Sequence, residues 1–277
     1  MTVERITTRV GWADFGDFEH FGVRLYRDLA GRVSFLQLAV FALGAGRLSD
    51  EDAAVLDDVA SCCHVADPRI WPLKLARLVA SAGRAVTGHL AACAVLDGDA
   101  IGAYAAEAAA LVLLEARDTP EPAEADVAFG ALLAGDAVPA GFGLQARRVD
   151  ERVVALRGCV AARGRAELPF WRVAERLWAA AQRQRGLEPN AFGAIAAACL
   201  DVGLSPPQIG ALTSILLQPS LVANAFEGAA LRSAALVRLP PERVVYTGPA
   251  PRESPRAAEA GAVTRRPASP ASERRNS

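Results

Sequence analysis

Aromatic residues and lysine are scarce in this sequence of 277 residues. Aromatic residues make up only 6% of the chain, and Lys74 is the one lysine beside 29 arginines. Alanine fills 59 positions, and it is the best helix former and a poor strand former. The composition therefore excludes an all-β fold and predicts an all-α protein with a sizeable buried core.

Charge of one sign is not in excess either, since the formal net charge is −1. A nucleic-acid-binding protein usually has a strong basic excess, so we expect no nucleic-acid partner. Acidic residues interrupt the long apolar region 86–114 at Asp97, Asp99 and Glu107, which predicts no membrane partner. The N-terminus lacks the apolar core of a secretory signal, and five cysteines show no paired spacing. We therefore expect a cytoplasmic protein without a metal site.

Capping residues and apolar spacing predict a succession of helices. Ser49 precedes three acidic residues and an apolar face, which is typical of a helix start. Residues 73–95 are expected to form one helix, and residues 100–116 another that is buried on most sides. Further helices are expected at residues 150–162, 170–186, 189–203, 205–218 and 220–237.

A segment rich in loop-forming residues, 117–150, separates two expected lobes of the helical fold. The large lobe would comprise residues 1–108 and 204–247, and the small lobe residues 109–203. From residue 248 to residue 277 the chain has no apolar periodicity and few residues that could build a core. This tail is expected to be disordered.

Five short segments, in order along the chain, carry motifs of a known family. In this order and near this spacing they resemble the citrate synthase family, most closely its short citryl-CoA-lyase-like branch. The resemblance covers about residues 20–250 and implies a helical fold with a large and a small lobe. The segments are residues 22–48 with Ser34 and Phe35, residues 76–81 (ARLVAS), residues 138–144 (VPAGFGL) with residues 150–152 (DER), residues 190–195 (NAFGAI) and residues 245–249 (VYTGP).

The catalytic residues of that family are missing at the matching positions. Citrate synthases use an aspartate to deprotonate the acyl-CoA methyl, one histidine to polarise the thioester and another to activate the oxo-acid. The resemblance places the two histidines at Gly102 and Leu144 and the aspartate at Phe192. These side chains offer no proton donor or acceptor, and each positioned acid or base contributes about 10²–10⁴-fold to a rate. We therefore expect a pseudoenzyme that serves as a non-catalytic or regulatory subunit.

The resemblance also implies a partner, because family members dimerise through flat, small-residue helix faces. The alanine-rich segments 86–114 and 220–237 suit such packing. The partner would be a second copy of the chain, giving a homodimer, or an active citrate-synthase-like paralogue, giving a heterodimer.

Three residues are candidates for binding CoA or an acyl-CoA. Arg147 and Arg148 follow the glycine-rich loop where the family meets CoA, and guanidinium groups bind phosphate oxygens in a bidentate manner. Asn190 stands where a family asparagine lies close to the adenine. The alternative is that the two arginines are solvated surface charge. Arg152 is expected to be a structural ion-pair partner.

Residues 62–74 contain many polar side chains and suggest a second function. This polar run lies where the family carries an H-x-D-H stretch that helps to line the oxo-acid site. His64 and Asp67 could approximate two of those polar positions, and Arg69 could hold a substrate carboxylate. Lys74 could act as a nucleophile if it is desolvated. On this interpretation the chain is an enzyme with altered chemistry on a CoA thioester. The alternative is a loop with a capping aspartate and Trp71 in the core.

Overall fold

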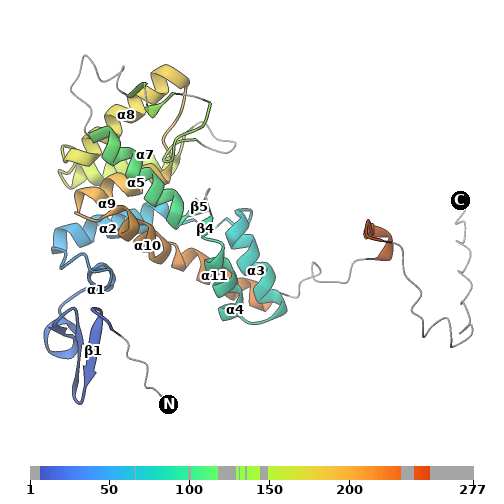
Figure 1. Cartoon of the computed structure of the whole chain (residues 1–277), viewed down its shortest axis with the longest axis horizontal. Helices are drawn as coiled ribbons and strands as arrows, with labels where there is room; N and C mark the ends of the chain where they lie inside the picture. Colours follow the sequence, from blue (N-terminus) through green and yellow to red (C-terminus); the bar gives the residue numbers. More distant parts are fainter. Residues whose placement is uncertain are drawn as a thin grey trace, which may run out of the picture. The chain divides into compact units, whose positions relative to one another are not determined.

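A computed structural model of the chain describes residues 7–65, 67–98, 101–117, 129–130, 132–134, 136–143, 149–231 and 240–249. It comprises two units, Met1–Ala235 and Leu236–Ser277. The first unit is mostly helical, as the composition predicts (Figure 1). In the second unit the described residues include one short 3-10 helix, η3 (Pro241–Arg243). The expected disordered tail lies outside the described residues from residue 250 onward.

A small antiparallel sheet precedes the helices, and the composition gives no indication of it. Strands β1 (Gly11–Asp14), β2 (Asp17–His20) and β3 (Val23–Arg24) pair in that order. Gly16 has φ +108° in the turn between β1 and β2, a conformation that favours glycine. A single π-helical turn, η1 (Leu25–Leu29), follows the sheet.

The first two α-helices begin at serine caps. Ser34 starts α1 (Phe35–Ala42): its Oγ accepts the Gln37 N–H at 3.2 Å, while Gln37 Oε1 accepts the Ser34 N–H at 2.8 Å. Ser49 likewise caps α2 (Asp50–Cys63), and the expected helix start there is confirmed. Each cap satisfies backbone N–H groups that have no partner within the helix.

The single helix expected over residues 73–95 is wrong, because the chain turns back on itself at Gly83. Two helices form instead, α3 (Trp71–Ala82) and α4 (Ala85–Ala94). They pack closely against each other, since a Cβ on Gly88 would lie 2.3 Å from the carbonyl oxygen of Ala76. A side chain at residue 88 would separate the helices, so glycine there explains their close packing.

A short hairpin leads into a helix that is buried on several sides. Strands β4 (Asp97–Gly98) and β5 (Ile101–Gly102) pair and continue into α5 (Ala103–Arg117). Helix α5 contacts α8, α9 and α10, which confirms the burial expected from its apolar sequence. Its buried residues are Ala105, Ala106, Ala109, Ala110, Leu113 and Ala116.

Three further helices match the expected segments closely. Helix α7 (Glu151–Ala162) begins after Asp150, and α8 (Pro169–Arg185) ends at Gly186, which has φ +62°. Helix α9 (Ala191–Asp201) begins after an asparagine cap and is buried along nearly its whole length.

The last two helices of the first unit follow one another almost without a break. Ser205 starts α10 (Pro206–Leu216) with a capping box, and α11 (Gln218–Ala230) follows. Together they supply one helical stretch, Pro206–Ala229, that is 24 residues long and apolar enough to cross a membrane. The prediction from residues 86–114 overlooked this stretch. Half of this stretch is buried inside the unit, as in the core helix of a globular protein. The absence of a membrane partner stays a prediction.

The buried apolar residues form two clusters. The larger one joins α1, α2, α5, α7, α8, α9 and α10. The smaller one joins α3, α4 and α11, which lie together in Figure 1. It combines leucines with the small side chains Ala76, Ala80, Ala92 and Ala225. The division into two lobes with the bounds given above stays a prediction.

Candidate functional site

The site implied by the resemblance lies where the loop 141–143 meets the start of α9. Asn190 connects the loop to the helix by hydrogen bonds. Its Oδ1 accepts the Phe192 N–H at 3.0 Å, and its Nδ2 donates to the carbonyl oxygen of Phe142 at 2.8 Å. Its backbone N–H donates to the carbonyl oxygen of Gly141 at 2.9 Å. Both polar ends of the Asn190 side chain are thus bonded within the protein.

Glycines allow the loop and two helices to approach closely. Gly141 has φ +88°, and a Cβ there would lie 3.1 Å from the Gly193 Cα on α9 and 3.3 Å from the Ala109 Cβ on α5. A Cβ on Gly193 would in turn lie 2.8 Å from the Gly141 carbonyl oxygen. The space between these segments is therefore filled by backbone.

A buried ion pair holds α7 and α9 in register. Asp150 Oδ1 and Oδ2 accept from Arg152 Nε at 2.8 Å and Nη2 at 2.7 Å, and Oδ2 also accepts the Ala191 N–H at 2.9 Å. Burial opposes ionisation of Asp150, but the Arg152 guanidinium and two backbone N–H groups hold its pKa below the ordinary value. The expectation that Arg152 is a structural ion-pair partner is confirmed.

Gly102, the position of the first family histidine, has no room for a side chain. Its φ is +99°, and a Cβ there would lie 2.1 Å from the Leu96 carbonyl oxygen. That oxygen accepts the Ala103 N–H at 3.0 Å, so it is fixed by the turn that starts α5. This backbone therefore accommodates glycine and no histidine at residue 102.

Of the other two positions assigned to catalytic residues, Phe192 is among the described residues and Leu144 is not. Phe192, at the position of the family aspartate, lies in the first turn of α9, where its half-buried ring packs against the larger apolar cluster. Leu144, at the position of the second histidine, lies outside the described residues, as do Arg147 and Arg148. The CoA-binding role of these two arginines and of Asn190 stays a prediction.

The polar run before α3 does not converge on one point. The exposed ring of His64 lies with its Nδ1 3.1 Å from the Oγ of Ser220, which is 1% exposed and closed to a substrate. Asp67 accepts from Arg69 Nε at 2.9 Å and Nη2 at 2.6 Å, so the arginine already has a carboxylate. Lys74 is exposed, which does not meet the condition of desolvation for a nucleophile.

The alternative interpretation of this polar run was a loop with a capping aspartate and Trp71 in the core. It is correct for the aspartate and wrong for Trp71. Asp67 caps the turn, since its Oδ1 accepts the Arg69 N–H at 2.9 Å. Trp71, expected in the core, is 47% exposed. It stands at the first position of α3, where Pro72 and Leu73 take the buried positions instead.

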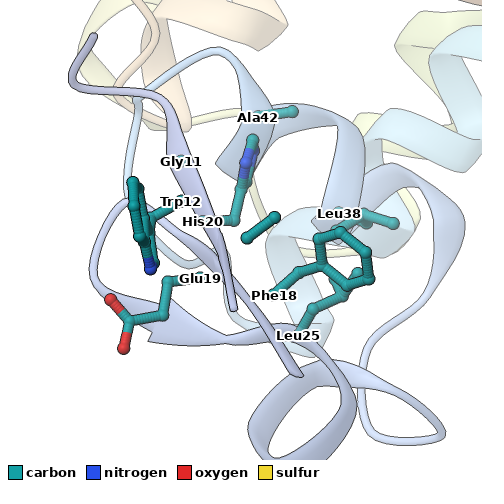
Figure 2. A pocket seen from close by; sticks show the side chains of 9 residues that line it. Gly11, Trp12, Phe18, Glu19, His20, Leu25, Leu38 and Ala42 are labelled. Carbon is teal, nitrogen blue, oxygen red and sulfur yellow. The ribbon is translucent and has the colours of Figure 1, made fainter. Parts of the chain in front are cut away.

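A cavity of about 500 Å³ lies between the N-terminal sheet and α1 and involves none of the candidate residues. Trp12 and Glu19 face each other across β1 and β2, and Phe18 lies beside Leu38, with His20 pointing toward α1 (Figure 2). The sequence contains a signal for this feature, because seven of its seventeen aromatic residues lie between residues 12 and 41.

The succession of helices, with the small hairpin before α5 and the glycine loop against α9, defines the citrate-synthase fold. Citryl-CoA lyase from Hydrogenobacter thermophilus has the same fold, with a TM-score of 0.76 over 92% of this chain and 100% of that chain, at 24% identity. ATP citrate lyase from Methanothrix soehngenii, solved with citrate and coenzyme A, gives a TM-score of 0.68 at 18% identity. The match covers 90% of this chain and 42% of that one.

A third similar structure is the citrate synthase of Thermoplasma acidophilum, solved with carboxymethyl coenzyme A and oxaloacetate. Its TM-score is 0.58 at 20% identity, over 82% of this chain and 60% of that chain. Neither a scan of protein-family models nor a search of curated proteins gives a match. The structural similarities therefore establish the fold, and the expected fold class is confirmed.

Proposed function

We propose that this chain is a citrate-synthase-fold protein that does not perform acyl-CoA carbon–carbon chemistry through a His/His/Asp triad. One observation carries the proposal: the position assigned to the first histidine is a glycine whose backbone leaves no room for a Cβ beside the Leu96 carbonyl oxygen. A phenylalanine at the position assigned to the aspartate supports it, because Phe192 has no group that removes a proton.

The role that fits such a chain is that of a non-catalytic or regulatory subunit. Exposed apolar side chains on neighbouring helices support a partner surface. Val86 and Leu90 lie one turn apart on α4 and are 64% and 60% exposed, and Phe226 on the adjoining α11 is 66% exposed. The proposed partner is a second copy of the chain or an active citrate-synthase-like paralogue, in the cytoplasm.

The proposed ligand is CoA or an acyl-CoA. Three similar structures were solved with coenzyme A, carboxymethyl coenzyme A or citryl-CoA bound. In this chain Arg147 and Arg148 are proposed for the phosphates, with Asn190 nearby. An enzyme with altered chemistry is less well supported, because the polar side chains do not face one site. His64 contacts Ser220, Asp67 and Arg69 pair with each other, and Lys74 is exposed.

Two measurements test the proposal. The purified chain should show a raised Tm with millimolar CoA or acetyl-CoA, and this shift should be lost in the double variant Arg147→Ala/Arg148→Ala. It should also co-purify with a second copy or with a citrate-synthase-like paralogue from the same cell. A strictly monomeric chain that retains no paralogue would overturn the subunit role.

A further inference from the structure

Two cysteines of the first unit that are far apart in the sequence have their side chains in contact. Cys62 is the penultimate residue of α2, and Cys159 lies near the end of α7, 97 positions later. Their Sγ atoms are 3.8 Å apart. A disulfide needs a separation of about 2.0 Å, so the sulfurs need approach by only about 1.8 Å.

An ion pair one turn away fixes the two helices in this arrangement. Arg163, four residues after Cys159, holds Asp58, four residues before Cys62, in a bidentate contact whose Nη2–Oδ1 distance is 3.0 Å. The helices are also packed directly on each other. The closure of a bond between the sulfurs therefore needs side-chain rotation and small helix adjustments rather than a rearrangement of the fold.

The remaining cysteines are placed differently. Cys63 and Cys199 are buried, and burial raises the pKa of each thiol to about 12. Cys93 is half-buried on α4, where its thiol donates to Gln218 Oε1 at 3.3 Å. Cys62 and Cys159 are partly buried, as Cys93 is, but differ from it because they are in mutual contact. The exposed part of each side chain gives a small oxidant access to the pair.

We propose that Cys62 and Cys159 form a reversible disulfide that links α2 to α7 under oxidising conditions. The oxidant is a small disulfide such as oxidised glutathione. One protein thiolate attacks it, forms a mixed disulfide and releases one glutathione thiolate. The second protein thiolate then attacks the protein sulfur of the mixed disulfide and releases the other glutathione. The two protein thiols lose two protons and two electrons, and oxidised glutathione is reduced to two thiols.

The bond would stabilise the part of the protein that carries the candidate site. Asp150 caps the start of α7, and its carboxylate also accepts the Ala191 N–H at the start of α9, so a link from α7 to α2 restrains both helices. Because the cross-link closes a loop of about 100 residues, it should raise the Tm by about 5–15 °C. Reduction with dithiothreitol should reverse the change.

The experiment uses the full chain and follows three readouts. After incubation with oxidised glutathione and quenching by alkylation in denaturant, the free thiols should fall from five to three. Peptide mapping without reductant should identify the Cys62–Cys159 link, with a mass loss of about 2 Da. Cys62→Ser and Cys159→Ala should each abolish the link and the Tm increase. The matched control Cys93→Ser should retain both.

Three results would overturn the proposal. Five free thiols after exhaustive oxidation would show that the pair does not close. A link between other cysteines would show that contact does not select this pair. A stable mixed disulfide with glutathione at Cys62 or Cys159 would show that the second exchange step fails.

Discussion

The carbonyl oxygen of Leu96 lies 2.1 Å from the point where a Cβ on Gly102 would be. Residue 102 also has φ +99°, which side chains rarely permit. The turn into α5 therefore requires glycine at the position where the resemblance to citrate synthases expects the first catalytic histidine.

Gly102→His should destabilise the protein and should not create activity. The strained backbone and the clash together should lower the free energy of unfolding by about 2–5 kcal/mol. Urea denaturation measures this loss. Gly158→Ala on α7 is the matched control, because nothing lies within 4 Å of a Cβ there. That variant should be neutral or more stable by up to about 1 kcal/mol. A stable Gly102→His variant would contradict the steric argument.

Asp150→Asn should lower the free energy of unfolding at pH 7 by about 3 kcal/mol, because it leaves the partly buried Arg152 without its carboxylate. The pKa of Asp150 in the folded protein is below the ordinary 3.8, so its contribution is present above that pH and is lost as the pH falls further. The difference between wild type and variant should therefore shrink below pH 3.8. Denaturation curves at several pH values measure it.

The exposed residue Asp57 supplies the control for that experiment. Asp57→Asn on α2 should change stability by less than about 0.5 kcal/mol at any pH. An equal loss in both variants would show that net charge, and not the ion pair, determines the effect.

Leu90→Arg and Phe226→Asp should each prevent self-association if the exposed faces of α4 and α11 form the partner surface. A charge buried in an apolar interface is costly unless it is paired. Light scattering after size-exclusion chromatography should give a dimer for the wild type and a monomer for each variant. Val154→Asp on α7, where Val154 is 53% exposed, should remain dimeric. A wild-type monomer would contradict the homodimer.

With Cys62 as the attacking thiol, the rate of disulfide formation between Cys62 and Cys159 should rise about tenfold for each pH unit between pH 7 and 10. Burial, contact with the Cys159 thiol and the nearby Asp58 raise the pKa of Cys62 to about 11, so the reactive thiolate is scarce at neutral pH. Timed alkylation with mass spectrometry measures the rate. A rate that levels off above pH 9, the ordinary pKa of a thiol, would contradict the raised pKa of Cys62.

Local signals in the sequence predicted most helix starts. Ser49 caps α2 as expected, and Asn190 and Ser205 cap α9 and α10 near the starts expected at residues 189 and 205. The break at Gly83 was missed, because α3 and α4 share one apolar pattern, and the close packing of the two helices at Gly88 is visible only in the structure. Such packing is a property of the folded chain.

The candidate site was predictable only in part, for the same reason. The Asp150–Arg152 pair is two residues apart, so the sequence indicates it directly. The contact between Cys62 and Cys159 brings together two helices 97 positions apart, and no spacing rule reports it. The contact of His64 likewise depends on where α11 places Ser220.

Turnover by the purified chain tests the central claim most directly. Oxaloacetate released from citryl-CoA and free CoA released from acetyl-CoA plus oxaloacetate would each be followed. Typical enzymes turn over at about 10 s⁻¹, and without the triad we predict a rate at least about 10³-fold lower. Turnover within tenfold of the typical rate, retained through repeated purification and abolished in His64→Ala or Asp67→Ala, would contradict the account and assign the chain an altered chemistry.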